Sequence, residues 1–169
     1  MNDVSLLEMM NAREMRCHLQ QQLLQLYKKP LICLTLNIPG PVKVLPGVPE
    51  AFETACNTIE SRLNEHRITI CHMETIKEKT GYEAFYSVDA TPESIKKLMI
   101  SIEDQDRPGR LLDIDVLRTD GAGVSREDLG FSPRRCLLCD EPAHVCSRSR
   151  RHSVAELTTE IDRILKERK

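Results

Sequence analysis

The order of strand-like and helix-like segments between residues 31 and 118 is the sequence feature that most constrains the fold. Four short runs favour β-strands because they are apolar and are bounded by turn residues, and they cover 31–37, 67–77, 82–89 and 110–118. Two segments with apolar residues at helical spacing separate them, at 50–66 and 91–103. The order strand, helix, strand, strand, helix, strand is that of a split βαβ unit, so we predict an α+β, ferredoxin-like sandwich.

Two further segments flank this core. Leucines at helical spacing predict an N-terminal helix within residues 1–28, which Lys28-Lys29-Pro30 ends. The segment 130–169 is rich in Cys and Arg, and a capping box of Ser153 and Glu156 begins a terminal helix that runs to residue 167. A chain of 169 residues fits one domain, so we predict a single domain over residues 1–169, with the α/β core at 31–118.

Composition and charge exclude several classes of protein. The net charge is −2 and aromatic residues make up only 4% of the chain, which argues against a nucleic-acid partner. The sequence contains no apolar run long enough for a membrane span and no signal-peptide pattern at its start, so we expect no membrane partner. Seven cysteines, an odd number, favour free thiols or a metal site over a disulfide framework, and we expect a cytoplasmic protein.

Two aspartates lie two positions apart on the last strand of the expected core. Side chains alternate across a strand, so Asp113 and Asp115 project from one face while Leu112, Ile114 and Val116 project into the core. Two adjacent carboxylates can hold Mg²⁺ against a phosphate chain. The alternative is the solvated polar face of an amphipathic strand, although Asp is a poor strand former.

Three cysteines and a histidine in the C-terminal segment have the composition of a zinc site. Cys136, Cys139 and Cys146 with His152, or with His144 in its place, would make a Cys₃His set. The alternative is that the reduced thiols only pack together. We favour packing over zinc at this point, because the fourth ligand is ambiguous between the two histidines.

Basic side chains suggest where phosphate groups would bind. Arginine side chains can bind phosphate in a bidentate manner, so the arginines that cluster near the C-terminus are candidates for a phosphate site. The alternative is a solvated surface run, which is the commoner fate of such clusters. Lys43 follows a Pro-Gly-Pro loop that leaves the first strand, and Arg13, Arg16 and Gln20 share one helix face. Either group would also suit a solvent-facing surface. The C-terminal candidates are Arg134, Arg135 and Arg148.

Several segments together show a resemblance to a known family. The stretches are AREMRCHLQ (12–20), LTLNIPGPVK (34–43), GRLLDIDVL (109–117) and PRRCLLCDEPAHVCSRSRRH (133–152). In these stretches the sequence resembles the apo-citrate lyase phosphoribosyl-dephospho-CoA transferases, and the third and fourth are the most specific. The resemblance implies a transferase of the nucleotidyltransferase type, which moves a prosthetic group from triphosphoribosyl-dephospho-CoA to a serine of the acyl-carrier (gamma) subunit of citrate lyase and releases diphosphate.

Given that activity, we assign the candidate residues roles as a hypothesis. Asp113 and Asp115 would hold Mg²⁺ on the triphosphate, and Arg110, Arg134 and Arg135 would neutralise the leaving group. No residue of the sequence stands out as the base for the serine. Two alternatives stay open, namely the same chemistry on another carrier, such as that of malonate decarboxylase, and a zinc-ribbon interaction module without enzymatic activity.

Overall fold

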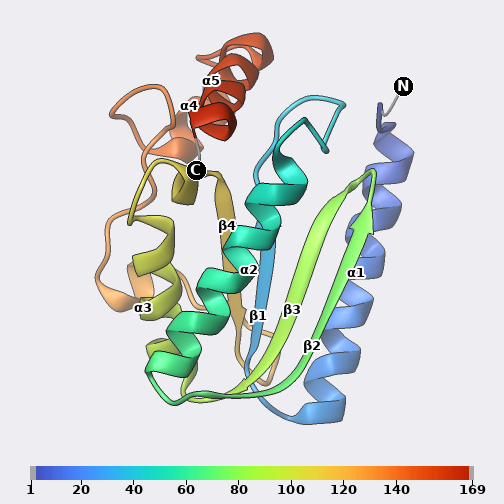
Figure 1. Cartoon of the computed structure of the whole chain (residues 1–169), viewed down its shortest axis with the longest axis vertical. Helices are drawn as coiled ribbons and strands as arrows, with labels where there is room; N and C mark the ends of the chain where they lie inside the picture. Colours follow the sequence, from blue (N-terminus) through green and yellow to red (C-terminus); the bar gives the residue numbers. More distant parts are fainter. Residues whose placement is uncertain (1–2, 168–169) are drawn as a thin grey trace.

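Helices cover both faces of one antiparallel sheet in the computed structural model, which describes residues 3–167 (Figure 1). The chain is therefore of the α+β class. The helices and strands are α1 (Leu6–Tyr27), β1 (Leu31–Leu36), α2 (Val48–Glu65), β2 (Thr69–Glu78), β3 (Gly81–Asp89), α3 (Pro92–Glu103), β4 (Leu112–Leu117), α4 (Ala143–Ser149) and α5 (Val154–Glu167), with short 3₁₀ turns η1 (Pro108–Leu111) and η2 (Glu127–Leu129).

The four strands lie in the order β2-β3-β1-β4, and each neighbouring pair is antiparallel. Strand β1 is central and pairs with β4 in a register that places Cys33 opposite Asp115 and Thr35 opposite Asp113. Strand β4 is consequently an edge strand, and its aspartates lie directly beside β1. The ferredoxin-like assignment and the single-domain assignment of residues 1–169 stay predictions.

The two sides of the sheet pack against different helices (Figure 1). Side chains of α2 and α3, among them Phe52 and Met99, form the main core with alternate residues of all four strands. The opposite side packs against α1 through Leu23 and Leu24, which contact a smaller cluster that includes Cys33. Asp113 and Asp115 share this second side, because cross-strand partners point to the same face of a sheet.

Side-chain caps explain why three of the helices begin where they do. Ser5 accepts a hydrogen bond from the backbone of Glu8, whose carboxylate accepts one from the Ser5 backbone in return, so α1 starts with a capping box. Thr91 caps α3 with Pro92 in the first turn, as expected. The predicted capping box of Ser153 and Glu156 is confirmed by hydrogen bonds of 2.9 and 3.0 Å.

One predicted boundary was wrong and one helix was not predicted, and both affect the site. Arg110 was placed on a strand, but it lies in η1, and β4 begins only at Leu112. The reason is local: the Asp106 carboxylate accepts a hydrogen bond from the Gly109 backbone, which tightens the chain into a turn before the strand starts. The Cys/Arg-rich segment also contains a helix, α4, for which the sequence showed no apolar periodicity.

The C-terminal helix α5 extends the structure beyond one end of the sheet (Figure 1). Ile161, Ile164 and Leu165 pack against Ile38 and Leu111, which flank the central and edge strands. This third cluster, between α5 and the residues that flank β1 and β4, fixes the position of the loop after β1. Among residues 3–167, no helix has both the length and the apolar character needed to cross a bilayer.

Candidate active site

The carboxylates of β4 share one face of the strand, as predicted. Leu112, Ile114 and Val116 are buried in the main core, whereas Asp113 and Asp115 alternate with them and are more exposed. Both aspartates therefore project from the side of the sheet that α1 covers only in part. The structure confirms this part of the sequence interpretation.

Charged side chains of α3 close the free edge of β4. Lys96 donates a hydrogen bond to the Ile114 carbonyl at 2.9 Å, and the Ile114 N–H donates to the Glu103 carboxylate at 2.8 Å. Arg126 donates to the other oxygen of Glu103 at 2.7 Å. These bonds satisfy an exposed strand edge and place charged groups beside the two aspartates.

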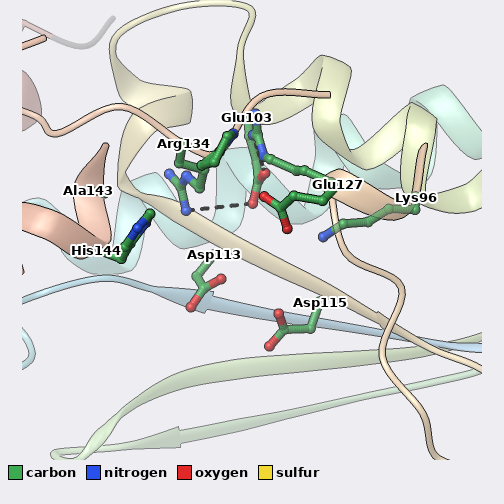
Figure 2. Close-up of a pocket in the computed structure, with 10 residues that line it drawn as sticks. Lys96, Glu103, Asp113, Asp115, Glu127, Arg134, Ala143 and His144 are labelled. Atoms are coloured by element: carbon green, nitrogen blue, oxygen red, sulfur yellow. Dashed lines mark hydrogen bonds and ion pairs between the residues drawn. The ribbon is translucent and has the colours of Figure 1, made fainter. Parts of the chain in front are cut away.

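A cavity of about 320 Å³ opens at this edge of the sheet. Figure 2 shows Asp113 and Asp115 projecting side by side, with Arg134 and His144 on the chain that covers the end of the cavity. Four carboxylates and three cationic side chains contribute to its wall, so it suits a cation together with an anion. The lining residues are Lys96, Glu103, Asp113, Asp115, Arg126, Glu127, Pro133, Arg134, Ala143 and His144.

A second, more enclosed cavity of about 150 Å³ lies between α1 and the sheet. Its wall contains Arg13 and Arg16 of α1, Lys43 of the loop after β1, and Glu83 of β3. Asp113 lines both cavities. The two cavities together are called the β4 groove below, and Asp113 lies where they meet.

The basic side chains of the smaller cavity are not fully neutralised by protein groups. Arg16 forms an ion pair with Glu83, and Lys43 donates to the Ile38 carbonyl at 2.8 Å. Within the described part of the chain no hydrogen bond or ion pair holds Arg13. Burial, and then the charge of Arg13, lower the pKa of Lys43. A bound anion would relieve this repulsion, which is the property expected of a phosphate site.

Two negative charges lie next to each other in the larger cavity, those of Asp113 and Asp115. Although Asp115 is exposed at the strand surface, the protein atoms around its carboxylate displace water and raise its pKa, and the neighbouring Asp113 carboxylate raises it further. Lys96 and Arg16 act in the opposite direction but do not cancel the effect. A divalent cation between the two carboxylates would remove the repulsion, so the residues present fit a magnesium ion.

The remaining sequence candidates do not line either cavity of the groove. Gln20 donates to the Cys33 sulfur at 3.2 Å, beneath α1. Arg110 donates to the carbonyls of Arg135 and Cys136 at 2.7 and 2.9 Å, so it holds backbone. Arg135 is exposed and donates to the Asp140 carbonyl. Arg148 is exposed on α4 and lines neither cavity.

Sequence reasoning missed several groups of the larger cavity. Lys96 and Glu103 are seven residues apart on the buried face of α3, where each directly follows a core isoleucine, Ile95 or Ile102. Charged residues beside an apolar stripe were the signal that could have found them. His144 was considered only as a zinc ligand, but it lines the cavity. Arg126 and Glu127 carry no comparable signal in the sequence, because only the fold brings them to β4.

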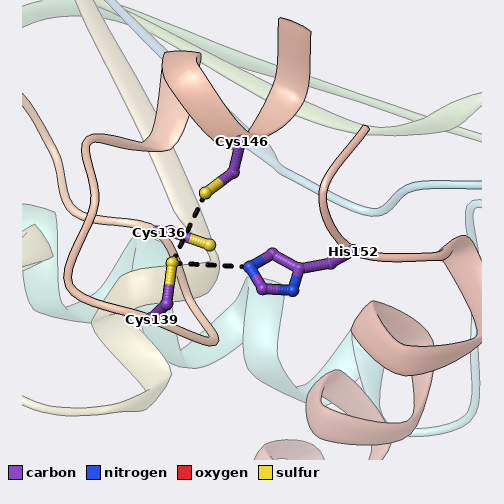
Figure 3. A group of neighbouring side chains, drawn as sticks. All are labelled: Cys136, Cys139, Cys146 and His152. Carbon is purple, nitrogen blue, oxygen red and sulfur yellow. Dashed lines mark hydrogen bonds between the residues drawn. The ribbon is translucent and has the colours of Figure 1, made fainter. Parts of the chain in front are cut away.

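The cysteines and histidine of the C-terminal segment form a compact cluster (Figure 3). The ligand atoms of Cys136, Cys139, Cys146 and His152 all lie within 4.8 Å of one another, so these residues can hold a metal ion such as zinc. His144 is not part of the cluster. The ambiguity between the two histidines, on which the preference for simple packing rested, is therefore removed.

Comparisons with known proteins agree with one another. The family model described as apo-citrate lyase phosphoribosyl-dephospho-CoA transferase matches residues 4–168. A probable apo-citrate lyase phosphoribosyl-dephospho-CoA transferase of Streptococcus pyogenes serotype M5 is 37% identical over 166 residues, which cover 96% of this chain and 85% of that protein. A protein of the same name from Vibrio cholerae serotype O1 (strain M66-2) is 36% identical over 160 residues, or 94% of this chain and 90% of that protein. Protein CitXG of Haemophilus influenzae is 35% identical over 94% of this chain, which spans 34% of that protein.

Proposed function

Because the chain belongs to the family of apo-citrate lyase phosphoribosyl-dephospho-CoA transferases, we propose that it performs the transfer in the β4 groove. The enzyme attaches the phosphoribosyl-dephospho-CoA prosthetic group to the acyl carrier protein of apo-citrate lyase. In the proposal the donor is 2′-(5″-triphosphoribosyl)-3′-dephospho-CoA, the acceptor is a serine of the carrier subunit, and diphosphate is released.

One observation supports this location above all others. Asp113 stands between a cavity that is rich in carboxylates and a cavity whose cations lack full neutralisation. A magnesium triphosphate needs both environments within a few ångströms, carboxylates for the metal and cationic donors for the phosphates. The family membership and the groove are independent arguments that favour the same chemistry.

The transfer exchanges one bond to phosphorus for another. The serine oxygen of the carrier forms a bond to the α-phosphorus, the bond from that phosphorus to the bridging oxygen breaks, and diphosphate leaves with the electron pair. In our proposal Arg13 and Lys43 bind phosphate oxygens in the smaller cavity, and Arg134 does so in the larger one. The serine proton passes to a group of the larger cavity, either one of the aspartates or His144.

Asp113 and Asp115 would hold Mg²⁺, which when bound would supply positive charge next to the phosphate oxygens. The protein itself contributes mainly orientation: β4 fixes both carboxylates on one rigid face, and α3 holds that strand through Lys96 and Glu103. Rigid placement of this kind reduces the reorganisation needed at the moment of transfer.

The intact mass of the carrier protein tests the proposed reaction directly. The apo-carrier of citrate lyase is incubated with the enzyme, Mg²⁺ and the triphosphoribosyl donor, and we expect it to gain the mass of the donor less diphosphate. The apo-carrier of malonate decarboxylase is the matched control for acceptor choice. Equal labelling of both carriers would contradict the proposed acceptor, and an unchanged mass of both would contradict the reaction.

The cellular compartment is a smaller part of the proposal. All seven cysteines are free, and two of them, Cys17 and Cys71, are exposed. Exposed free thiols persist in a reducing environment. We therefore keep the cytoplasm as the proposed location, and fractionation of cells that express the chain at native level would test it.

A further inference from the structure

We propose that Cys136, Cys139, Cys146 and His152 bind one Zn²⁺ ion, which folds the Cys/Arg-rich segment against the β4 groove. The four ligands come from three places: the turn at Cys136–Cys139, the helix α4, and the chain just after that helix. Figure 3 shows the four side chains converging on one point from these positions.

The distances among the ligand atoms suit a single zinc ion. The sulfur of Cys139 lies 3.4 Å from the sulfur of Cys146 and 3.4 Å from Nε2 of His152. A tetrahedral zinc with Zn–S of about 2.3 Å and Zn–N of about 2.0 Å requires roughly 3.8 Å between sulfurs and roughly 3.5 Å between sulfur and nitrogen. The observed values lie close to that geometry. They are far from the S–S length of about 2.05 Å in a disulfide, so oxidative pairing does not explain the cluster.

The burial pattern argues against packing as the only role of these thiols. From residue 131 to residue 153, Cys136 and Cys146 are the only buried side chains, each with 6% of its surface exposed. Its aliphatic side chains are at most partly buried, as is Leu137, which packs against the cluster around α5. Two thiols and one half-buried leucine bury too little apolar surface to offset the entropy of ordering more than twenty residues, whereas a bound zinc supplies folding free energy outright.

The backbone around the ligands has the form of a small metal-binding hairpin. The N–H of Cys136 donates to the Glu141 carbonyl, and the N–H of Ala143 donates to the Arg134 carbonyl, both at 2.7 Å. These bonds close the turn that carries the first two cysteines. After α4, the N–H of Arg151 donates to the Cys146 carbonyl at 3.2 Å, and this reversal returns His152 to the sulfurs.

The set of four protein ligands leaves no open position for substrate, so the ion is structural and not catalytic. Its effect reaches the groove through the chain that leads into and out of the hairpin. Arg134 donates to the Arg110 carbonyl at 2.8 Å, and Arg110 in turn donates to two carbonyls of the hairpin. Arg134, Ala143 and His144 all line the larger cavity. Zinc thereby holds one wall of the groove in place.

Zinc content and its dependence on single ligands test this inference without any transfer assay. Protein purified without chelators should contain one zinc per chain by elemental analysis. Cys139→Ser and His152→Ala should lower that content several-fold, whereas Cys71→Ser and His144→Ala should leave it unchanged. Folded wild-type protein without zinc would overturn the inference. Full zinc in Cys139→Ser, or loss of zinc in His144→Ala and not in His152→Ala, would overturn it as well.

A second measurement covers the case in which the ligand variants do not fold. Cobalt substituted into the wild-type protein should give the absorption of a tetrahedral ion with thiolate ligands, and zinc should displace it. A thiol reagent should release one zinc per chain from the zinc-loaded protein. Three cysteines that zinc shields from the reagent should react at the same time. Cobalt-loaded protein that shows no thiolate-to-cobalt charge-transfer absorption would contradict the assignment, because an oxygen site such as the aspartate pair cannot give that band.

Discussion

Asp113 and Asp115 carry like charges on neighbouring positions of one strand face, and the surroundings of Asp115 disfavour its ionised form. Such an arrangement lowers stability unless a cation is bound, so it is expected where function requires it. Arg13 and Lys43 form the corresponding pair of positive charges, and burial and then the charge of Arg13 disfavour the ionised form of Lys43. At the scale of single residues, the groove therefore contains like charges, Asp113 with Asp115 and Arg13 with Lys43, whose repulsion a bound ligand of opposite charge would relieve.

Arg134 and Arg135 are adjacent in sequence but differ in position, and this difference makes a prediction. Arg134 lines the larger cavity, whereas the side chain of Arg135 is exposed and donates to the Asp140 carbonyl. We expect Arg134→Ala to weaken donor binding about tenfold or more, because a charge-assisted phosphate contact is worth roughly 1.5–3 kcal/mol. Arg135→Ala should bind the donor like the wild type.

Calorimetric titration of the donor at two ionic strengths checks this pair of variants. The loss in Arg134→Ala should shrink as salt is raised, since screening weakens the missing contact in the wild type as well. Equal donor affinity in both variants and the wild type would show that Arg134 is only part of the protein surface. A larger loss in Arg135→Ala would place the phosphate contact outside the groove.

At the scale of elements, the first turn of α1 depends on an ionised carboxylate. The hydrogen bond to Lys79, and then the bond from the Ser5 backbone, lower the pKa of Glu8 to about 2. A carboxyl group whose pKa is lower in the folded state stabilises the protein fully at pH values above its ordinary pKa of 4.5. That stabilisation is lost as the pH falls toward 2, the pKa in the folded state. This turn matters to function because α1 presents Arg13 and Arg16.

Glu8→Gln should consequently lower the melting temperature at pH 7, and the difference from the wild type should close as the pH falls from 4.5 toward 2. Glu14→Gln on the same helix is the matched control, because within the described chain no ion pair holds Glu14. Melting curves recorded by circular dichroism across this range provide the measurement. A difference for Glu8→Gln that is constant with pH would contradict the role of its charge.

The turn before β4 gives a second prediction for an element. A Cβ added at Gly109 would lie 2.6 Å from the Ile102 carbonyl oxygen and 2.8 Å from that of Glu103, so the end of α3 would have to move. Gly109→Ala should therefore lower the free energy of unfolding by about 1–3 kcal/mol, as overpacking does. It should also slow transfer, because η1 leads directly into the strand of Asp113.

Gly123→Ala is the control for this substitution, since a Cβ at Gly123 meets no atom within 4 Å. Urea denaturation of the two variants should separate them clearly, with Gly123→Ala close to the wild type. If Gly109→Ala were as stable as the wild type, the close packing between η1 and α3 would not exist in solution.

For the whole molecule, the sequence predicted the features that depend only on residues close together in the chain. The capping box at Ser153, the end of the first helix at Lys28 and the shared face of Asp113 and Asp115 all follow from local spacing, and the structure confirms them. The family was also predicted, from four short segments, and the comparisons confirm it.

Contacts between segments that are far apart in the sequence could not be predicted from local spacing. The sequence placed Arg13 and Arg16 on one helix face but could not choose between solvent and sheet, because α1 has no strong apolar stripe. It could not join Arg126 to Glu103, or separate His144 from His152, since these depend on how the C-terminal segment folds back. Local periodicity carries little information about such long-range packing.

The rate of transfer by Asp113→Asn tests the central claim most directly, because Asp113 is the one residue within 3–167 that lines both cavities of the β4 groove. With saturating donor, Mg²⁺ and apo-carrier, we expect a loss of about 10²-fold or more, the size seen when electrostatic stabilisation of a transition state is removed. The variant should melt no earlier than the wild type, and Asp89→Asn, an exposed change at the far end of β3, should retain full activity. A folded Asp113→Asn enzyme that labels the carrier at the wild-type rate would contradict the account.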